Sequence, residues 1–381
     1  PRGRIGELIP DDEFYSLKAN DKLGKKWVSR RILPSFSQNT SQRGTICEGI
    51  ADEIENEIAG ANKGDYLYME IFDDIRIPVN ATTSVATTRA GKRSESIYQD
   101  TLSFASNEYK FQIRKDRKSL VVEVESNAKP IPKHFELRIL ETLRFLLARP
   151  LLWTVLYKNV AGTQSTIIRP SKGNQFEPRV QPPIKTFSRD TVDWFCQLFE
   201  KYLNYISSNT EFVLHPISIQ LQALFRASTG SIQTEVLVLC VAIESILASE
   251  FPQYGKAEEN ILKAVENALD FLKKWSWNND PEGQIKGRIF GSLHTIIKPN
   301  ASNRLSELID IGVIVKSHKD AWNDLRNKAA HGSGLNDVPT QQLINLSNVV
   351  LELLYKLIFF KIGYQGKYTA YSVSGWPIEE L

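Results

Sequence analysis

An arginine and a histidine stand five positions apart in the stretch from Ser317 to Gly332. Arg326 can hold two phosphate oxygens at once through its planar guanidinium, and His331 can move a proton near neutral pH. The chain has only 5 histidines in 381 residues, and this one follows an Arg-Asn pair closely. Together these residue types could cut RNA without a metal, because the 2′-hydroxyl of RNA supplies the nucleophile.

The arginine–histidine spacing alone is weak evidence, because a second copy occurs at Arg288 and His294. In that copy an isoleucine follows the arginine and cannot contact a phosphate. Its apolar neighbours predict a buried stripe, made of Ile289, Phe290 and Leu293. We therefore interpret the second copy as a surface arginine and a half-buried histidine.

The residues around Arg326 predict a helix over 317–331 whose core face leaves the arginine free. That face repeats at helical spacing, and Asn327 beside the arginine adds an amide that could orient a phosphate or the histidine. Ser317 with Asp320 resembles a capping box at the start of the helix. The core residues are Ala321, Trp322, Leu325 and Ala329.

His331 directly precedes Gly332 and is expected at the C-terminus of this helix. The negative end of the helix dipole there favours the imidazolium form, which suits acid–base chemistry. The same dipole opposes a phosphate, so the arginine and histidine must outweigh it. Two structural alternatives stay open: ordinary C-terminal capping by His331, and pairing of Arg326 with Glu307 or Asp310 on a neighbouring helix.

The composition and the changing pattern of apolar residues along the chain predict two domains and an α+β fold. A mass of 43.3 kDa, 42% hydrophobic and 24% charged residues are typical of a globular protein too long for one core. The net charge of +3 permits an acidic or nucleic-acid partner. Three widely spaced cysteines favour a reducing, cytoplasmic compartment and show no metal-ligand spacing.

We expect residues 1–168 to form a β-rich domain with a closing helix from Phe135 to Arg149. Within it, one helix is predicted around Ile46–Ile58, and a β-hairpin with a charged turn at Lys115–Lys118. Asn80 to Gly91 is predicted as loop or weak strand. Residues 169–186, with four prolines, are the predicted linker.

Residues 187–362 predict an all-α bundle. Apolar residues recur every three to four positions there, in segments near 189–207, 216–227, 231–250, 256–275, 285–297, 302–311, 317–331 and 338–362. Asp337 can cap the last helix, and Pro339 fits its first turn. The apolar run from Val349 to Ile362 contains charged residues, which favours a buried helix over a membrane span. The tail, residues 363–381, could add one edge strand.

Arg326-Asn-Lys-Ala-Ala-His331, on the penultimate helix of this predicted bundle, resembles the Arg-polar-x-x-x-His motif of HEPN ribonuclease domains. The segment starting at Leu237 is similar to the preceding HEPN helix, which often carries an acidic residue; here that residue is Glu244. The order of a β-rich region, a helix ending in Arg-Phe-Leu-Leu-Ala-Arg-Pro, and this bundle most resembles the ApeA-like HEPN proteins of bacterial antiphage defence.

The resemblance implies a toxin-like, metal-independent endoribonuclease of abortive infection that acts as a homodimer. Arg326 and His331 would be catalytic, with Asn327 and Glu244 in support. The partner would be RNA, with tRNA or another structured RNA as a candidate, and a phage-derived trigger could activate cleavage. We expect no metal, no cofactor and no membrane association.

A second reading from a different functional class stays open. A non-catalytic HEPN-like bundle would bind a partner protein or a nucleotide, with the β-rich half as its recognition module. For Glu244 two alternatives also stay open: it could orient Arg326 or His331, or it could be a buried acid paired with a core arginine.

Overall fold

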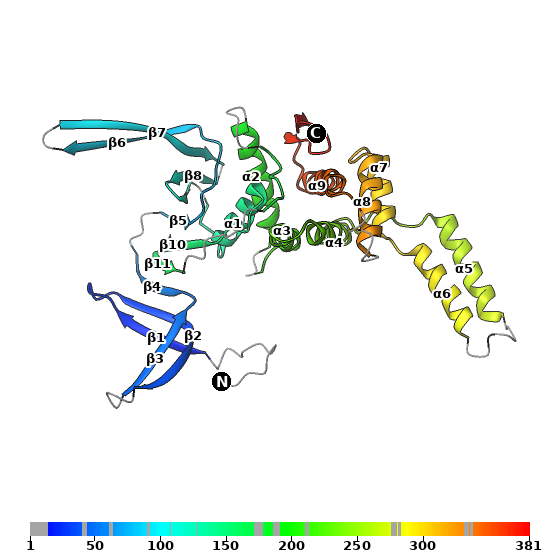
Figure 1. Ribbon diagram of the computed structural model, residues 1–381, viewed down its shortest axis with the longest axis horizontal. Coiled ribbons are helices and arrows are strands. Elements are labelled where there is room, and N and C mark those ends of the chain that lie inside the picture. The colour runs from blue at the N-terminus through cyan, green and yellow to red at the C-terminus, as the bar shows by residue number, and fades with distance from the viewer. Residues whose placement is uncertain are drawn as a thin grey trace. The chain divides into compact units, whose positions relative to one another are not determined.

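The computed structural model describes residues 14–39, 44–60, 64–89, 92–106, 108–127, 129–170, 178–185, 191–209, 213–275, 280, 283–330, 335 and 338–381. The architecture is mixed α+β, as predicted, with an antiparallel sheet in the N-terminal part and helices in the C-terminal part (Figure 1). The chain divides into two compact units. The first comprises residues 1–146, 150–177 and 185–212; the second comprises 147–149, 178–184 and 213–381.

Every strand pairing in the sheet of the first unit is antiparallel. In the part of the chain described, the order across the sheet is β1-β2-β4-β11-β10-β5-β9-β8-β7-β6, and β3 pairs with β2. The strands are β1 Tyr15–Asn20, β2 Lys26–Asn39, β3 Gly44–Ala51, β4 Ile54–Ala59, β5 Tyr66–Ile71, β6 Ala81–Arg89, β7 Lys92–Ala105, β8 Tyr109–Asp116, β9 Ser119–Ser126, β10 Trp153–Val160 and β11 Thr163–Ile168.

Two helices, α1 (Phe135–Leu147) and α2 (Val192–Ile206), provide aromatic residues that pack with the sheet. Alternate residues of β5 and β8 are buried, as expected where only one face of a sheet joins the core. Phe199 of α2 packs edge-on against Phe104 and Phe111, with ring centroids 5.1 Å apart in both pairs. Phe145 of α1 stacks on Tyr202 of α2 at 4.4 Å.

The prediction of a helix around Ile46–Ile58 is wrong, because this stretch forms the strands β3 and β4. Its isoleucines fall at every fourth position and mimic a helical period, yet Ile50 and Ile58 are exposed. Backbone pairing with β2 and β11 decides the structure instead. The hairpin turning at Lys115–Lys118 is confirmed by β8 and β9, and Asn80–Gly91 contains the strand β6.

The second unit is helical and follows the predicted segments closely. Its helices are α3 Pro216–Ala227, α4 Ile232–Glu250, α5 Glu259–Lys274, α6 Gln284–Ile297, α7 Ala301–Asp310, α8 Lys316–Ala330 and α9 Thr340–Ile362. The helices α5 and α6 run side by side as a hairpin (Figure 1). The tail does not extend the large sheet; β12 (Lys367–Thr369) and β13 (Ile378–Glu380) pair with each other.

The boundaries of the units differ from the predicted domains in two places. Helix α2 belongs to the first unit, although we began the bundle at residue 187, because its aromatic residues pack on the sheet and α1. Part of the predicted linker is structural: Val180 and Ile184 are buried in the second unit. Tyr355 also donates a hydrogen bond to the Gln181 carbonyl at 2.5 Å.

Within the described residues, two helices, α4 and α9, are long and apolar enough to cross a membrane by length and composition alone. The core helix of a folded unit passes the same test. In α9, 61% of the apolar window is buried inside the protein, as we predicted for Val349–Ile362, and the share in α4 is 44%.

A buried polar cluster joins α8, α9 and the tail. Nε2 of His318 lies 3.4 Å from Oε1 of Glu352, and both side chains are almost fully buried. Nδ1 of His318 accepts a hydrogen bond from the Val315 N–H, so Nε2 carries the proton that faces Glu352. The Ser372 N–H donates to Oε2 of Glu352 at 2.8 Å. Burial acts to raise the pKa of the Glu352 carboxyl, but the bonds from His318 and Ser372 outweigh it and leave this pKa lowered.

We predict that Glu352→Gln destabilises the protein by about 2 kcal/mol near neutral pH, because His318 and Ser372 lose a charged acceptor and one of them faces an NH2 donor instead. A lowered carboxyl pKa adds stability above the unfolded value of about 4.3, and this stability is lost as the pH falls through the folded value. The difference in melting temperature between Glu352→Gln and the parent should therefore shrink toward about pH 3. An equal difference at both pH values would contradict this, and exposed Glu266→Gln is the control.

Candidate functional site

Helix α8 presents the predicted core face. Trp322 and Leu325 are 2% and 0% exposed, Ala321 is also buried, and Ala329 is half-buried. Arg326 and Asn327 are exposed, as the spacing predicted. The core face thus holds the helix in place while leaving both polar residues available to a ligand.

The helix extends to Ala330, and the predicted His331 and Gly332 lie outside the described residues. The proximity of Arg326 to His331 therefore stays a prediction from sequence. Asp337, the expected cap of α9, also lies outside them, and Pro339 is the N-cap residue of that helix.

The capping box at Ser317 and Asp320 is wrong. Helix α8 begins at Lys316, so Ser317 lies inside its first turn. The Val315 N–H instead donates to Nδ1 of His318. Asp320 pairs with Lys316 at 2.5 Å.

Arg326 forms an ion pair with Glu244 of α4, and not with Glu307 or Asp310. Nε of Arg326 lies 2.9 Å from Oε1 of Glu244, and their side chains are 50% and 38% exposed. Glu244 is therefore half-exposed rather than a buried acid. Its bond occupies Nε and orients the guanidinium, whose two terminal nitrogens are separate donors.

The second arginine–histidine copy has a different setting. Arg288 and His294 are both exposed on α6, so the expected half-buried histidine is in fact on the surface. Neither residue lines the pocket found beside Arg326. These two residues form a matched control for the first copy.

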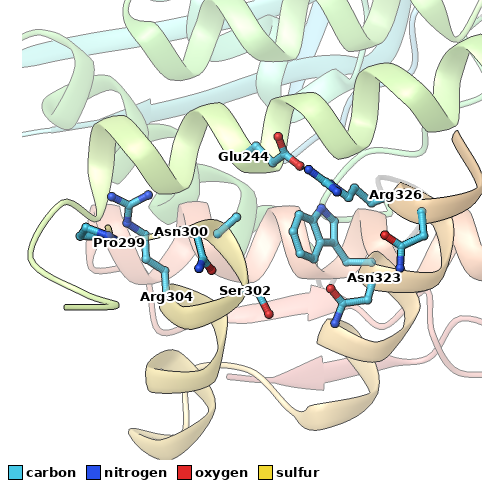
Figure 2. Close-up of a pocket in the computed structure, with 10 residues that line it drawn as sticks. Glu244, Pro299, Asn300, Ser302, Arg304, Asn323 and Arg326 are labelled. Atoms are coloured by element: carbon cyan, nitrogen blue, oxygen red, sulfur yellow. The ribbon is translucent and has the colours of Figure 1, made fainter. Parts of the chain in front are cut away.

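Beside the Arg326–Glu244 pair lies a pocket with a volume of about 480 Å³ (Figure 2). Its wall combines residues of α8 and α4 with the N-terminal turn of α7. In Figure 2, Arg304 and Arg326 lie on opposite sides of the pocket, with Asn300 and Ser302 between them. The other side chains of the wall include Trp322, Asn323 and Asn327.

A close backbone approach holds Arg304 in this wall. Gly255 has a φ of +73°, and a Cβ added there would lie 2.8 Å from the backbone nitrogen of Arg304. The Gly255 N–H donates to Glu307 Oε2 at 2.6 Å, which fixes the loop against α7. Lys319 of α8 donates to Ser306 of α7 at 2.5 Å and ties the two helices together.

The sequence analysis named Arg326, Asn327 and Glu244, which all line this pocket, but it did not name Arg304 and Asn300. We interpreted Pro299-Asn300 only as a turn that separates two predicted helices. The signal that could have found these residues was local: Asn300 is a favourable N-cap, and Arg304 follows one turn into the helix. That local pattern does not predict which helices α7 packs against.

Beside the Arg326–Glu244 pair, we considered a nucleophilic thiol and metal-ligating side chains. Burial and Glu244 raise the pKa of the Cys240 thiol to about 12 against the opposing effect of Arg326, so this cysteine is protonated near neutral pH. Over the described residues, no three His, Cys, Asp or Glu side chains gather closely enough to hold a metal ion. The pocket instead offers guanidinium, amide, hydroxyl and indole groups.

Comparison with known proteins adds no assignment: no family model, no curated protein and no solved structure matches the chain.

We predict that Gly255→Ala destabilises the protein by about 2–4 kcal/mol, because backbone strain adds to a clash with Arg304. Gly312 also has positive φ, at +79°, but a Cβ there would meet no atom within 4 Å. Gly312→Ala should therefore cost only the strain, about 1–2 kcal/mol. Chemical denaturation of both variants measures the difference, and equal losses would show that Gly255 does not press on Arg304.

Proposed function

We propose that this protein is a metal-independent endoribonuclease in which Arg326 and His331 cut RNA. The observation that carries the proposal is the setting of Arg326: it is exposed, oriented by Glu244, and lines a pocket rich in hydrogen-bond donors. His331 follows five positions later in the sequence. The resemblance of this motif to HEPN ribonuclease domains supports the same assignment.

In the proposed reaction the 2′-oxygen attacks the neighbouring phosphorus, and the bond from phosphorus to the 5′-oxygen breaks. One histidine takes the 2′-hydroxyl proton, and a second gives a proton to the leaving 5′-oxygen. Arg326 stabilises the charge on the pentacovalent phosphate through its terminal nitrogens. The products are a 2′,3′-cyclic phosphate and a 5′-hydroxyl, so atoms balance without an added water.

One histidine cannot easily act as base and acid at once, and a two-fold homodimer would supply one histidine from each protomer. The surface of α4 next to Glu244 supports such a dimer. Leu237 and Val241 are 45% and 48% exposed and lie on the same side of the helix as Glu244, at helical spacing. Paired α4 helices would bury these residues and bring two Arg326 side chains toward a shared site.

We further propose a toxin-like effector of abortive infection that acts in the cytoplasm. The effector role rests on the resemblance to ApeA-like HEPN proteins, and the cytoplasmic location rests on the scattered cysteines. RNA, with tRNA or another structured RNA as a candidate, would be the substrate. The β-rich unit would sense a phage-derived trigger.

A second candidate is a non-catalytic module that binds a nucleotide or a protein. The pocket supports this reading, because its donors could hold a ligand without His331. The two readings predict different effects of losing His331. In the enzyme, RNA cleavage is lost; in the binding module, ligand binding is unchanged.

We predict that Arg326→Ala and His331→Ala each lower RNA cleavage by about 10²–10⁴-fold, the range for losing charge stabilisation or proton transfer. Cleavage of labelled cellular RNA by the full chain, with EDTA present, measures this. Arg288→Ala and His294→Ala are matched controls and should cleave like the parent. Folded Arg326→Ala and His331→Ala proteins that cleave at the parent rate would eliminate the enzyme and favour the binding module.

We also predict that Val241→Glu converts the dimer to a monomer and removes cleavage, because two carboxylates would meet across the two-fold axis. Light scattering reports the assembly, and circular dichroism reports folding. Ile261→Glu adds the same charge to an exposed apolar position of α5 and should change neither. A Val241→Glu protein that stays dimeric would move the interface away from α4.

A further inference from the structure

Two residues in the wall of the pocket beside Arg326 have buried hydrogen-bond donors without a partner among the described residues. Trp322 is 2% exposed, and its Nε1 has no hydrogen-bond partner among the residues that the structure describes. The same holds for the buried Nε of Arg304. An indole N–H and a guanidinium N–H can only donate, so both await an acceptor. A buried donor without a partner is costly, which points to a ligand that completes the site.

The N-terminus of α7 adds to this excess of donors. Asn300 caps the helix by accepting a hydrogen bond from the Asn303 N–H at 2.9 Å, and its carbonyl accepts from the Arg304 N–H. The cap leaves the N–H groups of Ala301 and Ser302, both in the pocket wall, without carbonyl partners in the helix. The positive end of the helix dipole therefore faces the pocket and favours an anion.

The charges of the wall point the same way. Two arginines line the pocket against one carboxylate, Glu244, which is already paired with Arg326. Arg304 is thus the cation that Glu244 does not neutralise. A ligand with negative charge and several acceptor oxygens fits these groups, and a phosphate ester has both.

We infer that this pocket binds a backbone phosphate of the RNA strand next to the phosphate that is cut, with Arg304, the α7 N-terminus and Trp322 Nε1 as its donors. Arg326 and Arg304 flank the pocket on opposite sides, as two neighbouring phosphates of one strand require (Figure 2). The inference rests on the proposed function, because it assigns Arg326 to the cut phosphate. It also removes a difficulty of that function: the C-terminus of α8 opposes a phosphate, and the N-terminus of α7 offsets it.

Asn300→Asp separates ligand binding from folding. Aspartate caps a helix as well as asparagine does, so α7 should form normally and the melting temperature should not fall. The new carboxylate, however, stands in the pocket wall and repels a phosphate. Asn260→Asp is the matched control, because it adds the same charge to the first turn of α5, away from the pocket.

Binding is measured with the full chain and a short fluorescein-labelled 2′-O-methyl RNA, which lacks the nucleophile and cannot be cut. We expect Asn300→Asp and Arg304→Gln to weaken binding about tenfold, the scale of one charged hydrogen bond. In Arg304→Gln the slope of log affinity against log salt should fall by about 0.7, the value for one lost phosphate contact on a single strand. Asn260→Asp and Arg288→Gln should bind within twofold of the parent.

Parent-like affinity and salt dependence in both pocket variants would overturn the inference, as would a parent protein that does not bind this RNA. A free mononucleotide that binds through Arg304, with RNA binding unaffected by either variant, would overturn it in favour of a nucleotide site. Binding that depends on Arg304 in a protein that never cleaves RNA would rule out the proposed function, and the pocket would then be a site for an RNA phosphate without a cut phosphate beside it. RNA cleavage that depends on Arg326 but not on Arg304 would support the proposed function and overturn the pocket assignment.

Discussion

The ion pair between Arg326 and Glu244 is the interaction on which the candidate site depends. It joins α8 to α4 at 2.9 Å while half of the arginine side chain stays exposed. An exposed ion pair of this kind adds little stability, typically below about 1 kcal/mol. Its effect is geometric, because Glu244 occupies Nε and fixes where the terminal nitrogens point. A guanidinium held this way is oriented before a ligand arrives, which lowers the entropic cost of binding it.

Two helix ends near this pair have opposite effects on a phosphate. The C-terminus of α8 is unfavourable for a phosphate, whereas the first turn of α7 is favourable and lines the same pocket. Gly255 lets a loop pack against the backbone at Arg304, and Glu307 binds that loop. The site therefore depends on three helices and one loop, and its donors outnumber its acceptors. This imbalance is what an anionic ligand would correct.

Much of the helical unit was predictable, because helical periodicity is a local property; α3 covers the predicted 216–227 without change. Pairing between distant segments was not predictable. Ile46, Ile50, Ile54 and Ile58 have helical spacing but lie in strands, and α2 joins the first unit through ring contacts with Phe104 and Phe111. Arg326 and Glu244 were identified from one helix each. The position of Arg304 in the pocket wall depends on the close approach of Gly255, 49 positions earlier, which no local pattern encodes.

The chemical nature of the ends left on cleaved RNA tests the central claim most directly. Attack by the 2′-hydroxyl predicts a 2′,3′-cyclic phosphate on one fragment and a 5′-hydroxyl on the other, formed equally well with EDTA present. A single 2′-deoxy substitution at the cut position should then block that cut alone. Fragments ending in a 3′-hydroxyl and a 5′-phosphate, or cleavage that continues at the deoxy position, would contradict the assignment of Arg326 and His331.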